Sequence, residues 1–160
     1  YGRALVYRRM PDTGAPEVRD LAIARPVPLL IGISGRESLT ARTVAEVRRA
    51  WQRNPAVYEG IFRQIDALAL QGVDTLAGGD FERLGDLMNV CHGLLSALRV
   101  SSRELDEMVQ IAREHGALGA KLTGGGGGGS IVALAPEHRE RIAAALRDAG
   151  YRTLEIDLVA

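Results

Sequence analysis

Six consecutive glycines, at residues 124–129, constrain this chain more than any other feature of its sequence. Glycine loses more conformational freedom on folding than any other residue, so an ordered run of this kind needs a local use. The run can be interpreted as a flexible tether, or as a loop whose bare backbone N–H groups surround an anion. The segments on either side of the glycines distinguish these two interpretations.

The segment after the glycines, residues 131–160, predicts only a strand, a helix and a second strand. It is shorter than the roughly 40 residues at which unaided folding becomes plausible. Its first strand, at 131–135, must therefore pair with strands formed earlier in the chain. We expect the glycines to connect two strands inside one domain, which favours the anion-binding loop over the tether.

The composition excludes several other classes of protein. Lys+Arg and Asp+Glu number 20 each, so the formal charge is zero and neither nucleic acid nor a membrane surface is favoured as a partner. Cys91 is the only cysteine, which excludes an internal disulfide and fits a reducing cytoplasm. No apolar run approaches the roughly 20 residues of a transmembrane helix. We expect a cytoplasmic globular protein.

Apolar periodicity predicts an α+β fold in which helices cover one side of an antiparallel sheet. Trp51 lies on a helical apolar stripe and is expected in the core, and Pro136 is expected in the first turn of the last helix. In the last strand, Leu154, Ile156 and Leu158 alternate with polar residues and are expected to face the core. The predicted strands cover 3–9, 18–23, 29–33, 131–135 and 151–158, and helices begin near Leu39, Pro55, Asp80, Ser101 and Pro136.

The glycines lead into a strand, whereas a Walker loop and a dinucleotide-binding fingerprint both lead into a helix. The segment 119–130, Gly-Ala-Lys-Leu-Thr followed by six glycines and Ser, closely resembles the C-terminal glycine motif of the GHMP small-molecule kinases, and among them the mevalonate kinases in particular. The resemblance covers essentially the whole chain. It extends to residues 1–5, 32–35, 40, 44, 47–48, 87–95, 98–101 and 104–106.

This resemblance implies a ferredoxin-like GHMP kinase C-terminal domain at residues 26–160. Residues 1–25 would be a strand segment at the junction with an N-terminal kinase domain. The activity implied is transfer of phosphate from ATP, with Mg2+, to the primary hydroxyl of mevalonate, a step of isoprenoid precursor synthesis. The family's catalytic aspartate and lysine belong to the N-terminal domain, so this chain alone is expected to be inactive.

The resemblance also implies two groups of site residues. Those expected on the phosphate side are Lys121, Thr123, Gly124, Gly125, Gly126, Gly127, Gly128, Gly129 and Ser130. Those expected on the substrate side are Thr40, Asn89 and His92. Simpler explanations stay open, because lone threonines often bond nearby backbone and His92 lies on an apolar helix, where a hydrogen-bonded core histidine is common. No metal ligands are expected, since the histidines show no ligand spacing.

Some positions depart from the family pattern. The family usually has Asp where Ile33 stands, Ser-Thr-Lys at 39–41, and often Cys where Ser130 follows the glycines. The changes near the substrate leave the acceptor open, so a GHMP kinase with another acceptor is one alternative. A second is a free-standing domain that binds a metabolite or partner without chemistry. We also expect an exposed apolar surface where the N-terminal domain docks, and with it self-association into a homo-oligomer.

Overall fold

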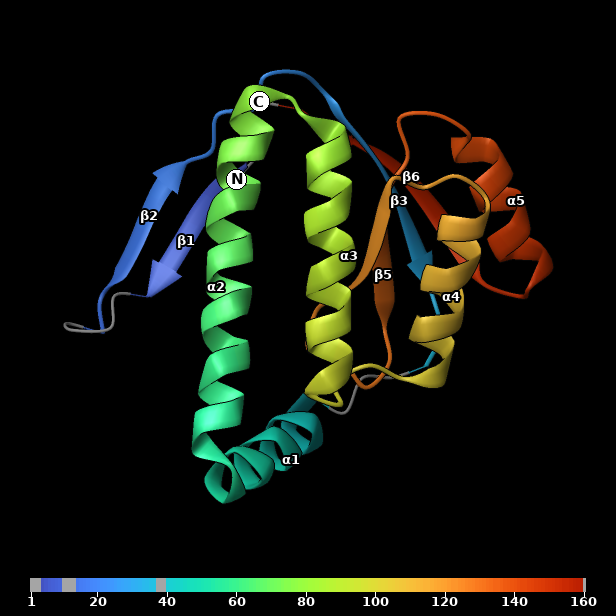
Figure 1. The fold of residues 1–160 in the computed structure, drawn as a ribbon. Helices are drawn as coiled ribbons and strands as arrows, with labels where there is room; N and C mark the ends of the chain where they lie inside the picture. The colour runs from blue at the N-terminus through green and yellow to red at the C-terminus, as the bar shows by residue number, and fades with distance from the viewer. Residues whose placement is uncertain (1–3, 10–13, 37–39, 160) are drawn as a thin grey trace.

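The computed structural model describes residues 4–9, 14–36 and 40–159 (Figure 1). Predictions that concern residues 1–3, residues 10–13 and Leu39 lie outside this range. The elements in chain order are β1 (Leu5–Arg9), β2 (Pro16–Asp20), β3 (Val27–Ile33), α1 (Thr40–Arg53), α2 (Pro55–Gly78), α3 (Phe81–Ala97), α4 (Arg103–Glu114), β4 (Gly119–Thr123), β5 (Ser130–Leu134), α5 (Arg139–Asp148) and β6 (Arg152–Leu158). No helix in the described ranges combines the length and apolarity needed to cross a membrane.

The central sheet has four antiparallel strands in the order β4-β5-β3-β6, and β1 and β2 form a separate antiparallel pair. The elements from β3 onward follow the β-α-β-β-α-β plan with this order, which is the ferredoxin-like arrangement. β5 pairs with β3 through Ile31 and Val132, and with β4 through Lys121 and Val132. The strand after the glycines therefore pairs with earlier strands, and the predicted fold class is confirmed.

Helices α4 and α5 cover one face of the sheet, while α2 and α3 run side by side beyond its β4 edge (Figure 1). The main core lies between the sheet and the α4–α5 layer. Its large, fully buried side chains include Leu30, Leu105, Met108, Ile131, Ile142 and Leu146. A smaller cluster joins α3 to the sheet through Phe81, Leu84, Val27 and Leu134. Asp80 caps α3, as predicted, by accepting a hydrogen bond from the Arg83 amide at 3.0 Å.

Of the three apolar residues of β6 predicted to face the core, Leu158 is half-buried against the smaller cluster, but the other two are not packed. Leu154 is 55% exposed and Ile156 is 38% exposed. The polar residues of the strand face α5 instead, where Arg139 pairs with Glu155 at 3.9 Å and with Asp157 at 2.5 Å. The α4–α5 layer covers the other strands through their apolar side chains but meets β6 through these ion pairs. An apolar part of the sheet is left exposed.

Two further predictions are wrong. Trp51 is 39% exposed, and its ring lies edge-on to Phe62 of α2, with 6.2 Å between ring centroids. The last helix begins at Arg139 instead of near Pro136. His138 precedes the helix in the left-handed conformation, with φ 58°. The His138 ring lies over Gly116, and the helix starts at the next residue.

Candidate functional site

The glycine run forms the loop of the β4–β5 hairpin. Thr123 and Ser130 are the last paired residues, and residues 124–129 connect them. Gly124, Gly126, Gly127, Gly128 and Gly129 have φ values of 83°, 74°, 73°, 146° and 94°. Side chains rarely tolerate this half of conformational space, so the path of the loop itself requires glycine.

The loop also lies too close to its neighbours for side chains. A Cβ on Gly126 would lie 2.2 Å from the Val100 carbonyl oxygen, and one on Gly125 would lie 2.6 Å from Thr40 Oγ1. A Cβ on Gly127 would lie 2.8 Å from Thr43 Oγ1. The loop therefore packs against the first turn of α1 on one side and the α3–α4 turn on the other. Thr40, predicted on the substrate side, thus lies against the glycine loop itself.

Some of the loop amides hold the loop in place. The Gly127 amide donates to the Val100 oxygen at 2.7 Å, and the Gly129 amide donates to the Arg36 oxygen at 3.1 Å and to Ser34 Oγ at 3.2 Å. The Ser34 amide in turn donates to the Gly129 oxygen at 2.9 Å. These bonds attach the end of the hairpin to the segment after β3.

The amides of Gly124, Gly125 and Gly128 donate to no group in the described ranges. Gly124 and Gly125 are exposed, and Gly125 lies next to Thr40, the first residue of α1. A helix N-terminus carries a partial positive charge, and free amides beside it form a favourable environment for an anion. The geometry provides one wall of an anion site.

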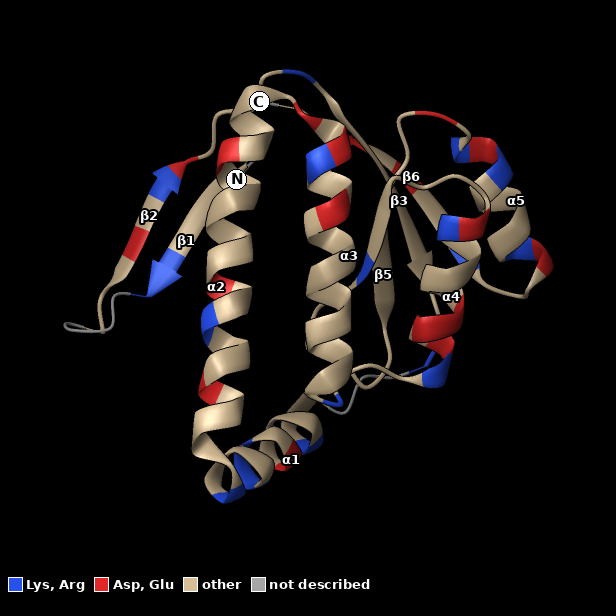
Figure 2. Ribbon diagram, viewed as in Figure 1, with Lys and Arg blue, Asp and Glu red and all other residues tan. Residues whose placement is uncertain are grey.

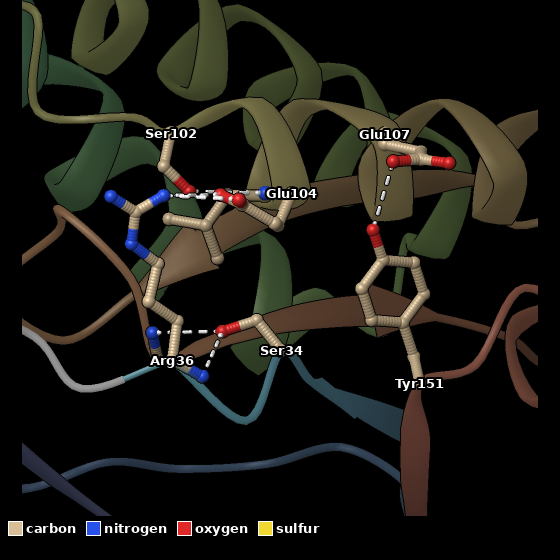
Figure 3. Close-up of polar contacts among 8 residues, drawn as sticks. Ser34, Arg36, Ser102, Glu104, Glu107 and Tyr151 are labelled. Atoms are coloured by element: carbon tan, nitrogen blue, oxygen red, sulfur yellow. Dashed lines mark hydrogen bonds and ion pairs between the residues drawn. The ribbon is translucent and has the colours of Figure 1, made fainter.

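Ser34 and Arg36 stabilise this wall, a role that the sequence alone does not indicate (Figure 3). Ser34 Oγ accepts from the Arg36 amide at 3.2 Å, and the Arg36 guanidinium pairs with Glu104 of α4 at 3.0 Å. Hydrogen bonds from its own backbone amide and from Ser102, followed by the Arg36 charge, lower the pKa of the Glu104 carboxyl. Arg36 therefore links the glycine loop to the start of α4.

Lys121, on β4, is half-buried beside the loop. Its Nζ donates to the Leu122 oxygen at 2.7 Å, and it lines an apolar cavity of about 390 Å³ that extends to Thr123 and Gly124. Burial lowers the pKa of the Lys121 amine, and burial raises the pKa of the Cys91 thiol in the same cavity wall. The ammonium of the only lysine of the chain is directed at the backbone, and its predicted role toward phosphate stays a prediction.

Asn89 and His92, predicted on the substrate side, bond to the outer edge of β4. Asn89 Nδ2 donates to the Leu118 oxygen and Asn89 Oδ1 accepts from the Ala120 amide, both at 3.1 Å. His92 Nδ1 accepts from the Leu122 amide at 3.3 Å. β4 is an edge strand, whose outward backbone groups would otherwise lack partners. Both residues fasten α3 to this edge.

His92 is buried, and its second ring nitrogen also has a partner. Nε2 donates to Asp106 Oδ1 of α4 at 3.2 Å. Desolvation lowers the pKa of the imidazole, and the Asp106 charge opposes this shift less strongly. With Nδ1 accepting and Nε2 donating, the ring is neutral and both of its nitrogens are occupied. The structure places His92 in the core, and a contact with substrate stays a prediction.

Gly85 of α3 and Gly119 of β4 contribute to the same contact, and neither was predicted to have this packing role. A Cβ on Gly85 would lie 2.6 Å from the Leu118 carbonyl, and one on Gly119 would lie 2.2 Å from the Gly85 oxygen. A glycine inside a predicted helix is the signal that could have identified Gly85. Arg113 completes the edge by donating to the Ala120 oxygen at 2.9 Å.

The remaining predicted residues lie at the base of the loop. Thr123 is exposed and Ser130 half-buried, directly across the hairpin from each other. No group of three or more metal-binding side chains occurs among the described residues. These features define a ferredoxin-like α+β domain whose β4–β5 hairpin carries a glycine loop beside a helix N-terminus.

Comparison with known proteins identifies the family. The family model described as "GHMP kinases C terminal" matches residues 66–152, more than half of the chain. The mevalonate kinase of Thermococcus sibiricus is 42% identical over 129 residues, which is 78% of this chain and 39% of that protein. The chain belongs to the GHMP kinase family and contains its C-terminal domain.

Solved structures agree with this assignment. The L. major mevalonate kinase, determined in complex with R-mevalonate, superposes with a TM-score of 0.84 at 35% identity, over 90% of this chain and 44% of that chain. The Methanococcus jannaschii mevalonate kinase has a TM-score of 0.73 at 25% identity, over 90% of this chain and 45% of that one. The chain thus spans about two fifths of the length of the curated relatives it matches, 39% for the T. sibiricus enzyme.

Proposed function

We propose that this chain is the C-terminal domain of an ATP-dependent mevalonate kinase, which converts mevalonate to 5-phosphomevalonate in isoprenoid precursor synthesis in the cytoplasm. One observation carries the proposal: glycine amides that donate to no group in the described part of the chain lie beside the N-terminus of α1, in a domain of this family. The mevalonate kinases among the relatives support mevalonate as the acceptor. The changes at Ile33 and around Thr40 keep a different acceptor as the alternative.

The residues of this chain would act on the nucleotide side. The amides of Gly124, Gly125 and Gly128 would donate to phosphate oxygens, and the N-terminus of α1 would stabilise their charge. ATP supplies the phosphoryl group, and Mg2+ would neutralise charge on its phosphates. The described residues offer no cluster that would hold Mg2+ by itself, so its protein ligands belong elsewhere in the enzyme.

Titration with MgATP tests the loop directly. The amide resonances of Gly124, Gly125 and Gly128 are expected to shift in the chain labelled with 15N, while those of Gly60 in α2 and Gly93 in α3 stay in place as internal controls. If the loop resonances do not shift at millimolar MgATP while the fold is intact, the proposal that this domain alone binds the nucleotide is wrong.

A turnover assay tests whether the catalytic residues lie outside this domain. Phosphoryl transfer depends on positioning and charge stabilisation, and we place the catalytic aspartate and lysine in the rest of the enzyme. The 160-residue chain is expected to show no mevalonate-dependent ATP consumption above background. Measurable turnover by the chain alone would contradict this assignment. It would not by itself exclude the glycine loop from nucleotide binding.

We further propose that the exposed β6 face, defined by Leu154 and Ile156, is where the N-terminal domain docks. Residues 26–160 would form the C-terminal domain and residues 1–25 the junction strand. Without its partner this face should promote self-association, which analytical ultracentrifugation can measure. Leu154→Lys with Ile156→Lys should give a monomer at concentrations where the parent chain associates. A strictly monomeric parent chain would contradict the proposal, and so would a double variant that associates as strongly as the parent.

A further inference from the structure

The outer face of α1 carries a basic stripe that the glycine loop does not use. Arg42, Glu46, Arg49 and Arg53 recur at a spacing of three or four residues and so share one side of the helix. Figure 2 shows several basic positions along α1, at the bottom of the view. Thr43, about a quarter turn away on the same helix, contacts the glycine loop. The stripe and the loop therefore lie on two sides of α1.

The stripe forms one wall of a cavity of about 470 Å³ between α1, the start of α2 and the end of α3. This arginine cavity is lined in particular by Arg42, Glu46, Arg49, Arg53, Tyr58 and Arg99. Its volume falls within the range of sites that bind small molecules. None of the residues 124–129 lines it, so it is separate from the glycine loop.

Positive charge is in excess in this cavity. Arg42 pairs with Glu46 at 2.9 Å, and a hydrogen bond from Arg42 is the main cause that lowers the pKa of the Glu46 carboxyl. Arg49, Arg53 and Arg99 have no carboxylate within 4.0 Å in the ranges that the structure describes. Four guanidinium groups thus face one carboxylate. A cleft lined by one sign of charge concentrates counter-ions of the opposite sign.

Arg99 has a backbone conformation that is unfavourable for a residue with a side chain. Its amide donates to the Ser96 oxygen at 2.8 Å, and the Val100 amide donates to the Leu95 oxygen at 3.2 Å, the paired bonds that end many helices. The residue at this point adopts the left-handed conformation, where glycine is usual, and Arg99 has φ 62°. A glycine would serve the helix end better. The arginine adds a guanidinium to the cavity.

We propose that the arginine cavity binds a small anion with several negative charges, and that its ligand class is a diphosphate group. Guanidinium groups bind phosphate oxygens in pairs of parallel hydrogen bonds, so converging arginines select an anion with several oxygens on neighbouring centres. A monovalent anion would leave most of the excess charge unbalanced. This site does not depend on the proposed kinase activity, because it shares no glycine of the loop.

Calorimetric titration of the 160-residue chain with inorganic pyrophosphate tests the proposal. Arg49→Gln and Arg99→Gly should each weaken binding roughly tenfold or more, as expected for loss of charge-assisted hydrogen bonds. Arg19→Gln, which removes an exposed charge on β2, should leave the affinity unchanged. Arg99→Gly should not lower the melting temperature, because glycine suits the backbone there. Loss of binding in that variant cannot then be attributed to unfolding.

Three results would overturn the proposal. One is equal affinity in the parent chain, Arg49→Gln and Arg99→Gly. Another is sulfate binding as tightly as pyrophosphate, which would reduce the site to general anion attraction. The third is amide shifts confined to the glycine loop, which would assign the bound pyrophosphate there. A short alkyl diphosphate distinguishes free pyrophosphate from an ester: tighter binding would add a contact to the organic group, and equal binding would show that the diphosphate alone is recognised. Both outcomes support the ligand class.

Discussion

Replacement of Asn89 by alanine tests whether this residue fastens α3 to the β4 edge or acts on a substrate. The substitution removes the bonds to the Leu118 oxygen and the Ala120 amide, each 3.1 Å long. Ala120 is fully buried, so its amide would be left without a partner, which costs about 1–3 kcal/mol. The Leu118 carbonyl lies in a half-buried residue, and loss of its bond adds about 0.5–1.5 kcal/mol.

We therefore expect Asn89→Ala to lower the free energy of unfolding by about 2–4 kcal/mol, measured by urea denaturation. Asn54→Ala is the matched control. Asn54 precedes α2 as its N-cap but makes no side-chain cap bond, so its loss should change stability by less than about 0.5 kcal/mol. Asn89→Asp keeps an acceptor for the Ala120 amide but cannot donate to Leu118, and should lie between the parent and Asn89→Ala.

A result in which Asn89→Ala and Asn54→Ala are equally stable would refute the structural role of Asn89. If the longer enzyme carrying Asn89→Ala also kept its stability while its activity fell, the predicted substrate-side role would be favoured instead. A loss of stability with unchanged KM for the acceptor would support the fastening role.

Three other predictions follow from single contacts. Gly126→Ala should lower the free energy of unfolding by about 2–5 kcal/mol, because its Cβ would lie 2.2 Å from a carbonyl oxygen. Gly124→Ala should lower it by only about 1–2 kcal/mol, because Gly124 has a φ of 83° but open space around it. Equal denaturation midpoints for the two variants would contradict this. Because desolvation holds the folded-state pKa of His92 below 6.5, its contribution to stability is complete above pH 6.5 and is lost as pH falls below that value. Urea midpoints measured from pH 7.5 to pH 5 should show this loss, and His92→Gln should reduce it; an unchanged pH dependence in the variant would refute it. Tyr151→Phe should cost about 1 kcal/mol by removing the 2.9 Å bond to Glu107, and no change in unfolding free energy would show that the bond adds nothing.

The place of the glycine loop could be predicted from the sequence. Residues 131–160 are too few to fold alone, so their first strand had to pair with earlier strands, and the glycines had to lie between two of them. The family could also be predicted, because the glycine motif is local and its residues are contiguous. Helix periodicity and the cap at Asp80 are local signals of the same kind.

The roles of Asn89 and His92 were decided by tertiary structure. In sequence they are polar residues on an apolar helix, a pattern equally compatible with a cleft and with a hydrogen-bonded core. Only the position of α3 against an edge strand shows that the outward amides of β4 are their partners. The contact of Gly85 with Gly119 was also invisible, because the two glycines lie far apart in the chain.

The packing of distant elements also explains why neither the exposed face of β6 nor the arginine cavity could be predicted from the sequence. Alternation along β6 determines that Leu154 and Ile156 share a face, but which face the helices cover depends on where α5 docks, and its Arg139 pairs with the polar side. Likewise, Arg99 joins the stripe on α1 only because the end of α3 is folded against it. Sequence periodicity thus determined which side chains lie together on one element. The packing of distant elements determined what those side chains meet, and therefore which are buried, which are free and which form a site.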